Sequence, residues 1–259
     1  MSSNVVVALG SAMARWIPAG WMNRMIAWMG ACSYPIRWTG WEGNNVALNR
    51  SVCFGAARQA ALRMPRTTVL HIQVDTDVFP VVPLDRVVQI ALEDFREPGV
   101  RIVASPTVAP VGYDAHQALL QIGPRVPYDG PAEEGGFPKG KAFDVAYVPF
   151  GLVAFHPSFL VELPTLGRFK YADGKAYDLF FERRGSYSED TLCCEMARKL
   201  GYRVQAEPRF WALHRHLADY ASYGMPESPG GEASREDAVK DHPEGEGGEE
   251  GDGDGEDGE

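Results

Sequence analysis

Short apolar runs alternate with helical spacings over the first hundred residues of this chain. The runs have the length and composition of buried strands, and the stretches between them place apolar residues three and four positions apart. The predicted strands span residues 5–9, 69–74 and 101–105, and the predicted helices span residues 19–30, 44–63 and 83–97. Gly10 is expected to end the first strand. This alternation predicts an α/β fold whose central sheet is mostly parallel and carries helices on both faces.

The regular pattern then stops. Residues 106–143 are rich in proline and glycine and show little periodicity, which is typical of a functional loop. Strand character returns over residues 147–155 and again over residues 203–206.

A further helix is predicted after Ser188. This serine can cap the helix, and Glu189 and Asp190 fall in the first turn, where negative charge suits the helix dipole. The expected buried stripe consists of Leu192, Met196 and Leu200, which recur every four residues. Gly201 is expected to end the helix.

The negative charge of the chain is concentrated at its C-terminal end. The 259 residues have a formal net charge of −10, whereas residues 226–259 alone hold 14 acidic and 2 basic residues. Residues 1–225 are therefore close to neutral, and the last segment has little apolar surface to bury. We predict a folded domain over residues 1–225 and a disordered acidic tail over residues 226–259, which either solubilises the chain or binds a basic partner.

The cysteines and the N-terminal segment argue against a secreted or membrane-bound protein. No pair of the four cysteines has C-x-x-C spacing, which favours a reducing compartment over a disulfide framework or a zinc site. The run from Val5 to Leu9 is too short for a signal sequence or a membrane span. We therefore predict a cytoplasmic protein without a membrane span.

A near-neutral domain without a basic stripe also argues against duplex DNA as the main partner.

Two aspartates follow the second predicted strand. The apolar run breaks at Asp75, and Asp77 comes two residues later. Carboxylates at the end of a buried strand are costly unless a cation or hydrogen bonds satisfy them. Ligands of α/β sheets bind at the carboxyl ends of strands, and oxygen ligands suit Mg²⁺ or Mn²⁺ carrying a phosphate. The pair is a candidate metal site, and an ordinary turn stabilised by the aspartate side chains is the alternative.

Other candidate residues lie elsewhere in the chain. Asp190, beside Glu189, could accept a proton from an acceptor hydroxyl, or both could serve only the helix dipole. His214 could be a third metal ligand, or an ordinary histidine of the core or surface. Arg50 and Arg58, on the helix before the aspartates, could bind phosphate or belong to a solvated helix face.

The phenylalanines at 180 and 181, together with Tyr187, have two interpretations. They could belong to the core or could line a site for an acceptor, and the sequence does not separate these possibilities.

In their order along the chain, these segments resemble those of glycosyltransferases of the GT-A type. The matching segments are Val5–Gly10, Asn49-Arg50 with Ala57-Arg58, Val69–Pro80, Phe150–Phe155, Ser188–Cys193 with Gly201-Tyr202, and His214. They cover about residues 4–220. The resemblance implies a Rossmann-like GT-A fold and transfer of a sugar from a nucleotide-sugar donor with the help of Mn²⁺ or Mg²⁺.

The resemblance also implies roles for single residues. Asp77 would bind the metal directly, Asp75 would contact the metal or the ribose, and His214 would complete the metal site. Asp190, with Glu189 beside it, would act as the base of an inverting transfer. The residues implied to bind the donor are Leu9, Gly10, Arg50, Arg58, Asp75 and Gly151.

Two features depart from the family pattern. Leu152 stands where many relatives have a second glycine, and residues 106–143 have no counterpart. The donor sugar, the nucleotide base and the acceptor (a glycan, a protein or a modified nucleic acid) therefore stay open, as does the oligomeric state.

Two other functions fit parts of the pattern. A nucleotidyltransferase would carry a glycine-rich phosphate loop with arginine and lysine, whereas residues 9–15 hold one glycine and no lysine. A non-catalytic binding module on the same fold is the other alternative, with the acidic tail as its interaction element.

Overall fold

The computed structural model describes residues 4–13, 19–42, 45–80, 82–105, 107–110, 118–121, 141–171, 173–185, 187–210 and 212–214. For His214, and for the strands within residues 107–121, it describes the backbone alone. In chain order the elements are β1 (Val5–Met13), α1 (Ala19–Gly30), β2 (Ile36–Glu42), α2 (Val46–Arg63), β3 (Thr68–Asp75), β4 (Val78–Pro80), α3 (Leu84–Asp94), β5 (Val100–Ala104), β6 (Thr107–Pro110), β7 (Ala118–Gln121), β8 (Phe143–Asp144), β9 (Leu152–Phe155), α4 (Pro157–Glu162), β10 (Gly167–Lys170), β11 (Ala176–Leu179), α5 (Glu189–Lys199), β12 (Arg203–Ala206), the 3₁₀ helix η1 (Pro208–Phe210) and β13 (Ala212–His214).

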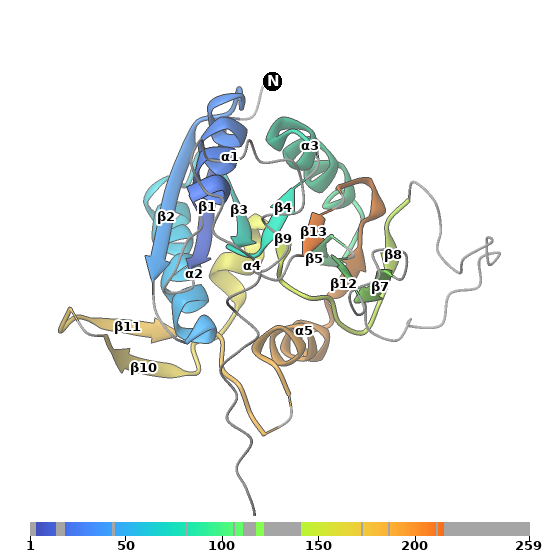
Figure 1. The fold of residues 1–259 in the computed structure, drawn as a ribbon. Coiled ribbons are helices and arrows are strands. Elements are labelled where there is room, and N and C mark those ends of the chain that lie inside the picture. The colour runs from blue at the N-terminus through green and yellow to red at the C-terminus, as the bar shows by residue number, and fades with distance from the viewer. Residues whose placement is uncertain are drawn as a thin grey trace, which may run out of the picture. The chain divides into compact units, whose positions relative to one another are not determined.

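Seven strands form the central sheet, in the order β2-β1-β3-β9-β5-β12-β8 (Figure 1). The strand β1 is parallel to β2 and β3, and β5 is parallel to β12. Two strands run the other way: β9 between β3 and β5, and β8 beside β12. Five of the seven strands therefore point in one direction, and we call the edge at which they end the carboxyl edge.

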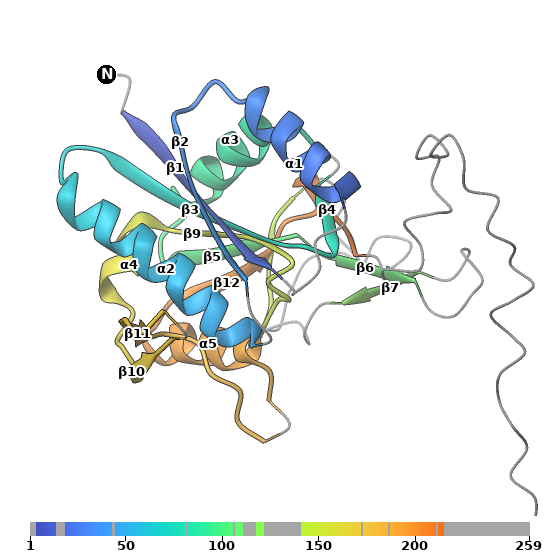
Figure 2. The same cartoon turned by 60° about the vertical axis from the view of Figure 1, so that its left-hand side comes forward.

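Helices cover both faces of this sheet. In Figure 2, α1 and α3 lie above the sheet, whereas α2, α4 and α5 lie below it. The alternation of side chains along β3 explains this arrangement, since Leu70, Ile72 and Val74 join one apolar core and Val69 joins the other. The predicted α/β class, with a mostly parallel sheet and helices on both faces, is confirmed.

The first strand is longer than predicted. It continues beyond Gly10 to Met13, because β3 pairs with it as far as Ala12 on one side and β2 as far as Met13 on the other. A methyl group at Gly10 would lie 2.8 Å from His71 Cε1 and 2.9 Å from Cys53 Cβ. The glycine therefore allows α2 to pack closely on the sheet, and the prediction that it ends the strand is wrong.

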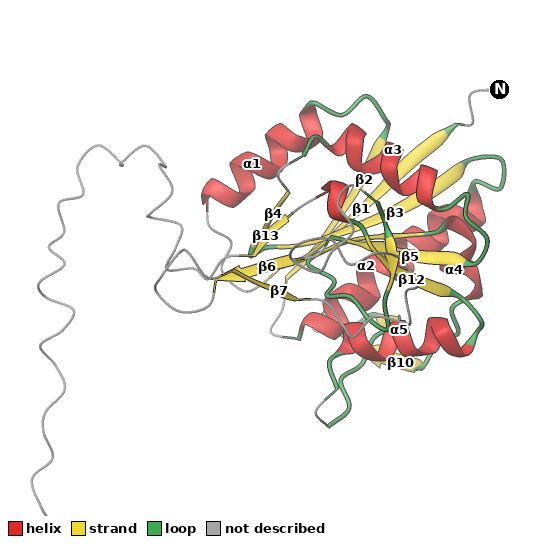
Figure 3. Cartoon of the chain, turned by 90° about the vertical axis from the view of Figure 1, so that its right-hand side faces the viewer, coloured by secondary structure: helices red, strands yellow, loops and turns green. Residues whose placement is uncertain are grey.

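Two smaller sheets accompany the central one (Figure 3). One has the strand order β4-β13-β6-β7, and the other is the hairpin of β10 and β11. The strands β6 and β7 pair antiparallel within the segment predicted to be irregular, so this part of the prediction is wrong. Most of the remainder of residues 106–143 lies outside the described residues.

The buried face of α5 differs from the predicted stripe. Cys193, Cys194 and Ala197 are buried, whereas Leu200 is exposed and the other two predicted stripe residues are half-buried. These small side chains join a core crowded with phenylalanines, including Phe180 and Phe181, which are fully buried. The helix can approach this core because its inner side chains are small, and the two phenylalanines are core residues.

All four cysteines are free. Burial raises the pKa of the Cys53 and Cys194 thiols to about 12, so both stay protonated at neutral pH. Within the described parts of the chain, no helix combines the length and apolar character needed to cross a membrane.

Candidate functional site at the carboxyl edge

Helix α2 brings Arg50 to the carboxyl edge of the sheet. The helix follows β2, so its N-terminus lies at this edge, and the Asn45 side chain caps it by accepting a hydrogen bond from the amide of Leu48 at 3.2 Å. Arg50 precedes Phe54 by four residues and Ala57 by seven, and all three are buried. The arginine therefore occupies the inner face of α2, with only 4% of its side chain exposed.

Two carboxylates from distant segments share the Arg50 guanidinium. Nη2 donates a hydrogen bond to Asp75 Oδ2, and Nη1 donates one to Glu189 Oε1. The ring of Phe150 lies 5.7 Å from the guanidinium carbon. Burial alone would lower the pKa of Arg50, but the two carboxylates and Asp190 raise it overall. We call Arg50, Asp75 and Glu189 the Arg50 cluster.

Asp75 ends β3 and has one oxygen committed. Its amide donates to the Gly151 carbonyl at 2.9 Å, which ties the end of β3 to the start of β9. Oδ2 accepts from Arg50, whereas Oδ1 has no hydrogen-bond partner among the described residues. Burial raises the pKa of Asp75 to about 7 against the opposing effect of Arg50, and Asp77 and Glu189 raise it further. A carboxyl group with this pKa gains or loses its charge near neutral pH.

The first turn of α5 holds Asp190 in a similar way. Oδ1 of Asp190 accepts a hydrogen bond from the Ser188 hydroxyl and another from the Thr191 amide at 2.7 Å. Its Oδ2 accepts none from any residue that the structure describes. Ser188 occupies the N-cap position as predicted, but its hydroxyl bonds to Asp190 and makes no capping bond to a helix amide. The half-buried Asp190 therefore has one oxygen anchored by Ser188 and Thr191 and one without a partner among the described residues.

The backbone of His214 lies beside the strand that begins directly after Asp77. Asp77 lies in the turn between β3 and β4, and β13 pairs antiparallel with β4 so that His214 stands opposite Val78. Among the described side chains, no group of three or more histidines, cysteines or acids could hold a metal ion, and the His214 side chain is outside that set. The unpartnered Oδ1 of Asp75 and the nearby carboxylate of Asp77 are hard oxygen donors, which fits Mg²⁺ or Mn²⁺.

The other predicted donor-binding residues are distributed more widely. Gly151 contacts Asp75 through its carbonyl, and Leu9 is buried in the core on the side of α1 and α3. Arg58 lies two turns beyond Arg50 along α2, where it donates to the Leu163 carbonyl at 3.0 Å and stacks on Phe180. The structure therefore does not bring Arg58 into the Arg50 cluster.

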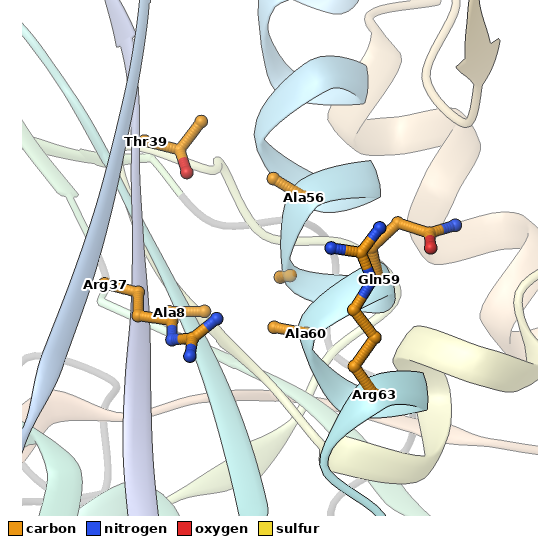
Figure 4. A pocket seen from close by; sticks show the side chains of 8 residues that line it. Ala8, Arg37, Thr39, Ala56, Gln59, Ala60 and Arg63 are labelled. Carbon is orange, nitrogen blue, oxygen red and sulfur yellow. The ribbon is translucent and has the colours of Figure 1, made fainter.

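A cavity of about 270 Å³ lies between the sheet and α2 and is lined by residues of β1, β2 and α2 (Figure 4). Alanines of β1 and α2 form its floor, and the side chains of Arg37, Thr39, Gln59 and Arg63 surround it. None of these residues belongs to the predicted site.

A second group of charged residues was not predicted. Arg209 in η1 donates two hydrogen bonds to Glu207 Oε2, at 2.6 and 2.9 Å, one to Asp94 and one to Glu93. We call these four residues the Arg209 cluster. Its sequence signal is Glu207, an acid directly after the apolar end of a strand, which is the same signal as at Asp75.

Comparisons with known proteins give structural similarities only. No family model matches this chain, and no curated protein matches it. The crystal structure of A197 from STIV is 14% identical with a TM-score of 0.48, and the match covers 82% of this chain and 86% of that one. GalNAc-T7, solved with UDP, GalNAc and Mn²⁺, is 12% identical with a TM-score of 0.45, over 83% of this chain and 43% of that one. A glycosyltransferase involved in the glycosylation of the major capsid of PBCV-1 is 12% identical with a TM-score of 0.29, over 61% and 62% of the two chains.

Proposed function

We propose that this chain is a glycosyltransferase that uses Mn²⁺ or Mg²⁺ to move a sugar from a nucleotide-sugar donor to an acceptor hydroxyl. The observation that carries the proposal is the Arg50 cluster. It joins the strand-end aspartate of β3 to the acidic first turn of α5 at the carboxyl edge, where ligands of α/β sheets bind.

The proposed reaction divides between the two segments. Asp75 and Asp77, with His214, would hold the metal and the donor diphosphate, and the bound metal would supply charge neutralisation for the leaving diphosphate. The acceptor oxygen bonds to the anomeric carbon while the bond from that carbon to the diphosphate oxygen breaks. Because this single displacement takes place opposite the leaving diphosphate, the transfer is inverting, and Asp190 takes the acceptor proton on its other carboxylate oxygen.

The local charges support this division of roles. The carboxylates of Asp75 and Glu189 surround one buried guanidinium. The charge of Asp190 also acts on Arg50, and the charge of Asp77 acts on Asp75. An excess of negative charge at the end of a strand favours binding of a divalent cation.

The location and extent of the enzyme belong to the same proposal. Four free cysteines fit a reducing, cytoplasmic compartment. The catalytic domain would span residues 1–225, and the acidic residues 226–259 would form a tail that catalysis does not need.

An assay with several donors tests the proposal. The full chain is incubated with UDP-, GDP-, TDP- and CDP-sugars and Mn²⁺, and the release of nucleoside diphosphate and free or transferred sugar is measured. A glycosyltransferase releases nucleoside diphosphate from at least one donor, and EDTA abolishes this release. If added pyrophosphate is consumed and sugar 1-phosphate and nucleoside triphosphate form, the chain is a nucleotidyltransferase. Absence of turnover with every donor would favour a binding module.

A further inference from the structure

Arg50 is in contact with both halves of the proposed site. Its two terminal nitrogens bond to carboxylates that lie 114 residues apart in the chain, one ending β3 and one opening α5. The exposed fractions are 4% for Arg50, 19% for Asp75 and 14% for Glu189, so the cation is more deeply buried than either of its partners. A guanidinium in this position cannot leave its partners for water at low cost.

We propose that Arg50 is a positioning residue that couples the Asp75 end of β3 to the first turn of α5, so that a change at Asp75 moves the helix that carries Asp190. The inference rests on the proposed function for the roles of the two segments. It assigns Glu189 the task of anchoring α5, and it leaves Asp190 as the group that faces the acceptor.

The chemistry of arginine suits this coupling. A planar guanidinium presents Nη1 and Nη2 in a fixed fork, so a shift of one partner changes the geometry offered to the other. A lysine would keep the charge but would offer one ammonium group without the fork. The Phe150 ring beside the guanidinium further restricts its movement.

The link from Glu189 to Asp190 is short. The two residues are consecutive in the first turn of α5, and Asp190 is tied to that turn by Ser188 and Thr191. In Asp75→Asn the guanidinium keeps only Glu189 as a bonded carboxylate, so the first turn of α5 is held less firmly to β3.

Hydrogen exchange in the unliganded full chain tests the coupling. The measured quantity is the exchange rate of the first bonded amides of α5, beginning with Leu192, whose amide donates to the Ser188 carbonyl at 3.1 Å. The variants are Asp75→Asn, Arg50→Lys and the double variant, and Arg58→Lys is the matched control on the same helix. Asp75→Asn should speed this exchange about tenfold, as expected for loss of one charge-assisted hydrogen bond. In the Arg50→Lys background the same change should have less than about a twofold effect, and Arg58→Lys should leave the rate unchanged.

Each outcome decides the inference. Equal effects of Asp75→Asn in both backgrounds would show that Arg50 only fills space, and the coupling would be wrong. If Arg50→Lys does not fold, Glu189→Gln replaces it. Without the Glu189 carboxylate the link to α5 is lost, so Asp75→Asn should no longer change the exchange rate. Because the measurement needs neither metal nor donor, coupled exchange without sugar transfer would retain this inference and overturn the proposed function. Sugar transfer with equal effects in both backgrounds would do the opposite.

Discussion

The Arg50 and Arg209 clusters each place one arginine among carboxylates, yet they expose opposite partners to solvent. In the Arg50 cluster the guanidinium is 4% exposed, and its carboxylates are 19% and 14% exposed. In the Arg209 cluster the guanidinium is 25% exposed, Asp94 is 7% exposed and Glu207 is fully buried, whereas Glu93 lies at the surface with 47% exposed. The first arrangement presents negative charge to an incoming cation, and the second buries the carboxyl groups of Asp94 and Glu207 inside the fold.

The two clusters also differ in how far their hydrogen-bond partners lie from the arginine in the sequence. Arg209 bonds to three carboxylates, and its main partner, Glu207, is only two residues away. Arg50 bonds to two carboxylates, both from distant segments. Each cluster leaves one buried carboxylate oxygen without a partner among the described residues, Asp75 Oδ1 in the first and Asp94 Oδ2 in the second. We therefore expect changes in the Arg50 cluster and α5 to affect activity, and changes in the Arg209 cluster to affect stability.

The largest expected effect is on turnover by Asp190→Asn. If Asp190 is the base, its loss should reduce turnover by roughly 10²–10⁴-fold with donor binding retained. Steady-state kinetics with the best donor gives the turnover, and calorimetry gives donor binding. Glu189→Gln is the control at the same helix end and should reduce turnover less. Near-normal turnover of Asp190→Asn would make another base, or a retaining mechanism, the better interpretation.

We expect the Arg209 cluster to stabilise the fold without taking part in donor binding. Arg209→Met leaves the fully buried Glu207 without its cation, beside Asp94, whose pKa burial raises to about 8. This should cost about 3–5 kcal/mol of unfolding free energy at neutral pH. Urea denaturation gives this value, and Arg209→Lys is the milder variant if the methionine form does not fold. Donor affinity of the folded fraction should match that of the unchanged chain. A stable Arg209→Met protein with impaired donor binding would contradict our division of roles.

A smaller effect is expected from pH. The pKa of Asp75 is raised to about 7 in the folded chain, so between pH 4 and pH 7 the folded state holds a proton that the unfolded state has released. The contribution of Asp75 to stability therefore falls as pH rises through this window. Asparagine does not titrate, so Asp75→Asn should gain stability relative to the unchanged chain from pH 4 to pH 7. Urea denaturation at several pH values measures the difference, and a difference that does not vary with pH would show that Asp75 keeps an ordinary pKa.

The smallest effect is expected from removal of the acidic tail. A chain that ends near Tyr223 should melt within a few degrees of the full chain and should keep its turnover, since residues 226–259 offer almost no apolar side chains to a core. Thermal denaturation and the donor assay measure both properties. Unfolding of the shortened chain would move the domain boundary towards the C-terminus.

Periodicity predicted the elements of this fold better than it predicted their faces. The runs at 69–74 and 203–206 became strands, and the helices at 19–30 and 44–63 appeared within two residues of their predicted ends. The stripe of α5 failed because Cys193, Cys194 and Ala197 repeat with the same helical spacing as the larger residues. Only the crowded phenylalanine core selects the smaller set, and a single sequence does not reveal how closely two elements pack.

The sequence predicted only part of the candidate site, because only part of the site has local sequence signals. Carboxylates at a strand end and at a helix start are local signals, and both lie at the carboxyl edge. The partners of Arg50 depend on contacts between distant segments. Its burial had a local signal, because Arg50 shares the apolar face of α2 with Phe54 and Ala57, and a buried arginine requires carboxylate partners.

Binding of nucleoside diphosphate tests the central claim most directly. Calorimetry of UDP, GDP, TDP and CDP is carried out with Mn²⁺ and with EDTA, on the unchanged chain and on Asp77→Asn. Our account predicts that at least one of them binds with Mn²⁺, that EDTA abolishes this binding, and that Asp77→Asn loses the metal dependence while its melting temperature stays close to that of the unchanged chain. Equal binding with Mn²⁺ and with EDTA, or unchanged metal dependence in Asp77→Asn, would contradict the claim that the end of β3 holds a metal and the donor diphosphate.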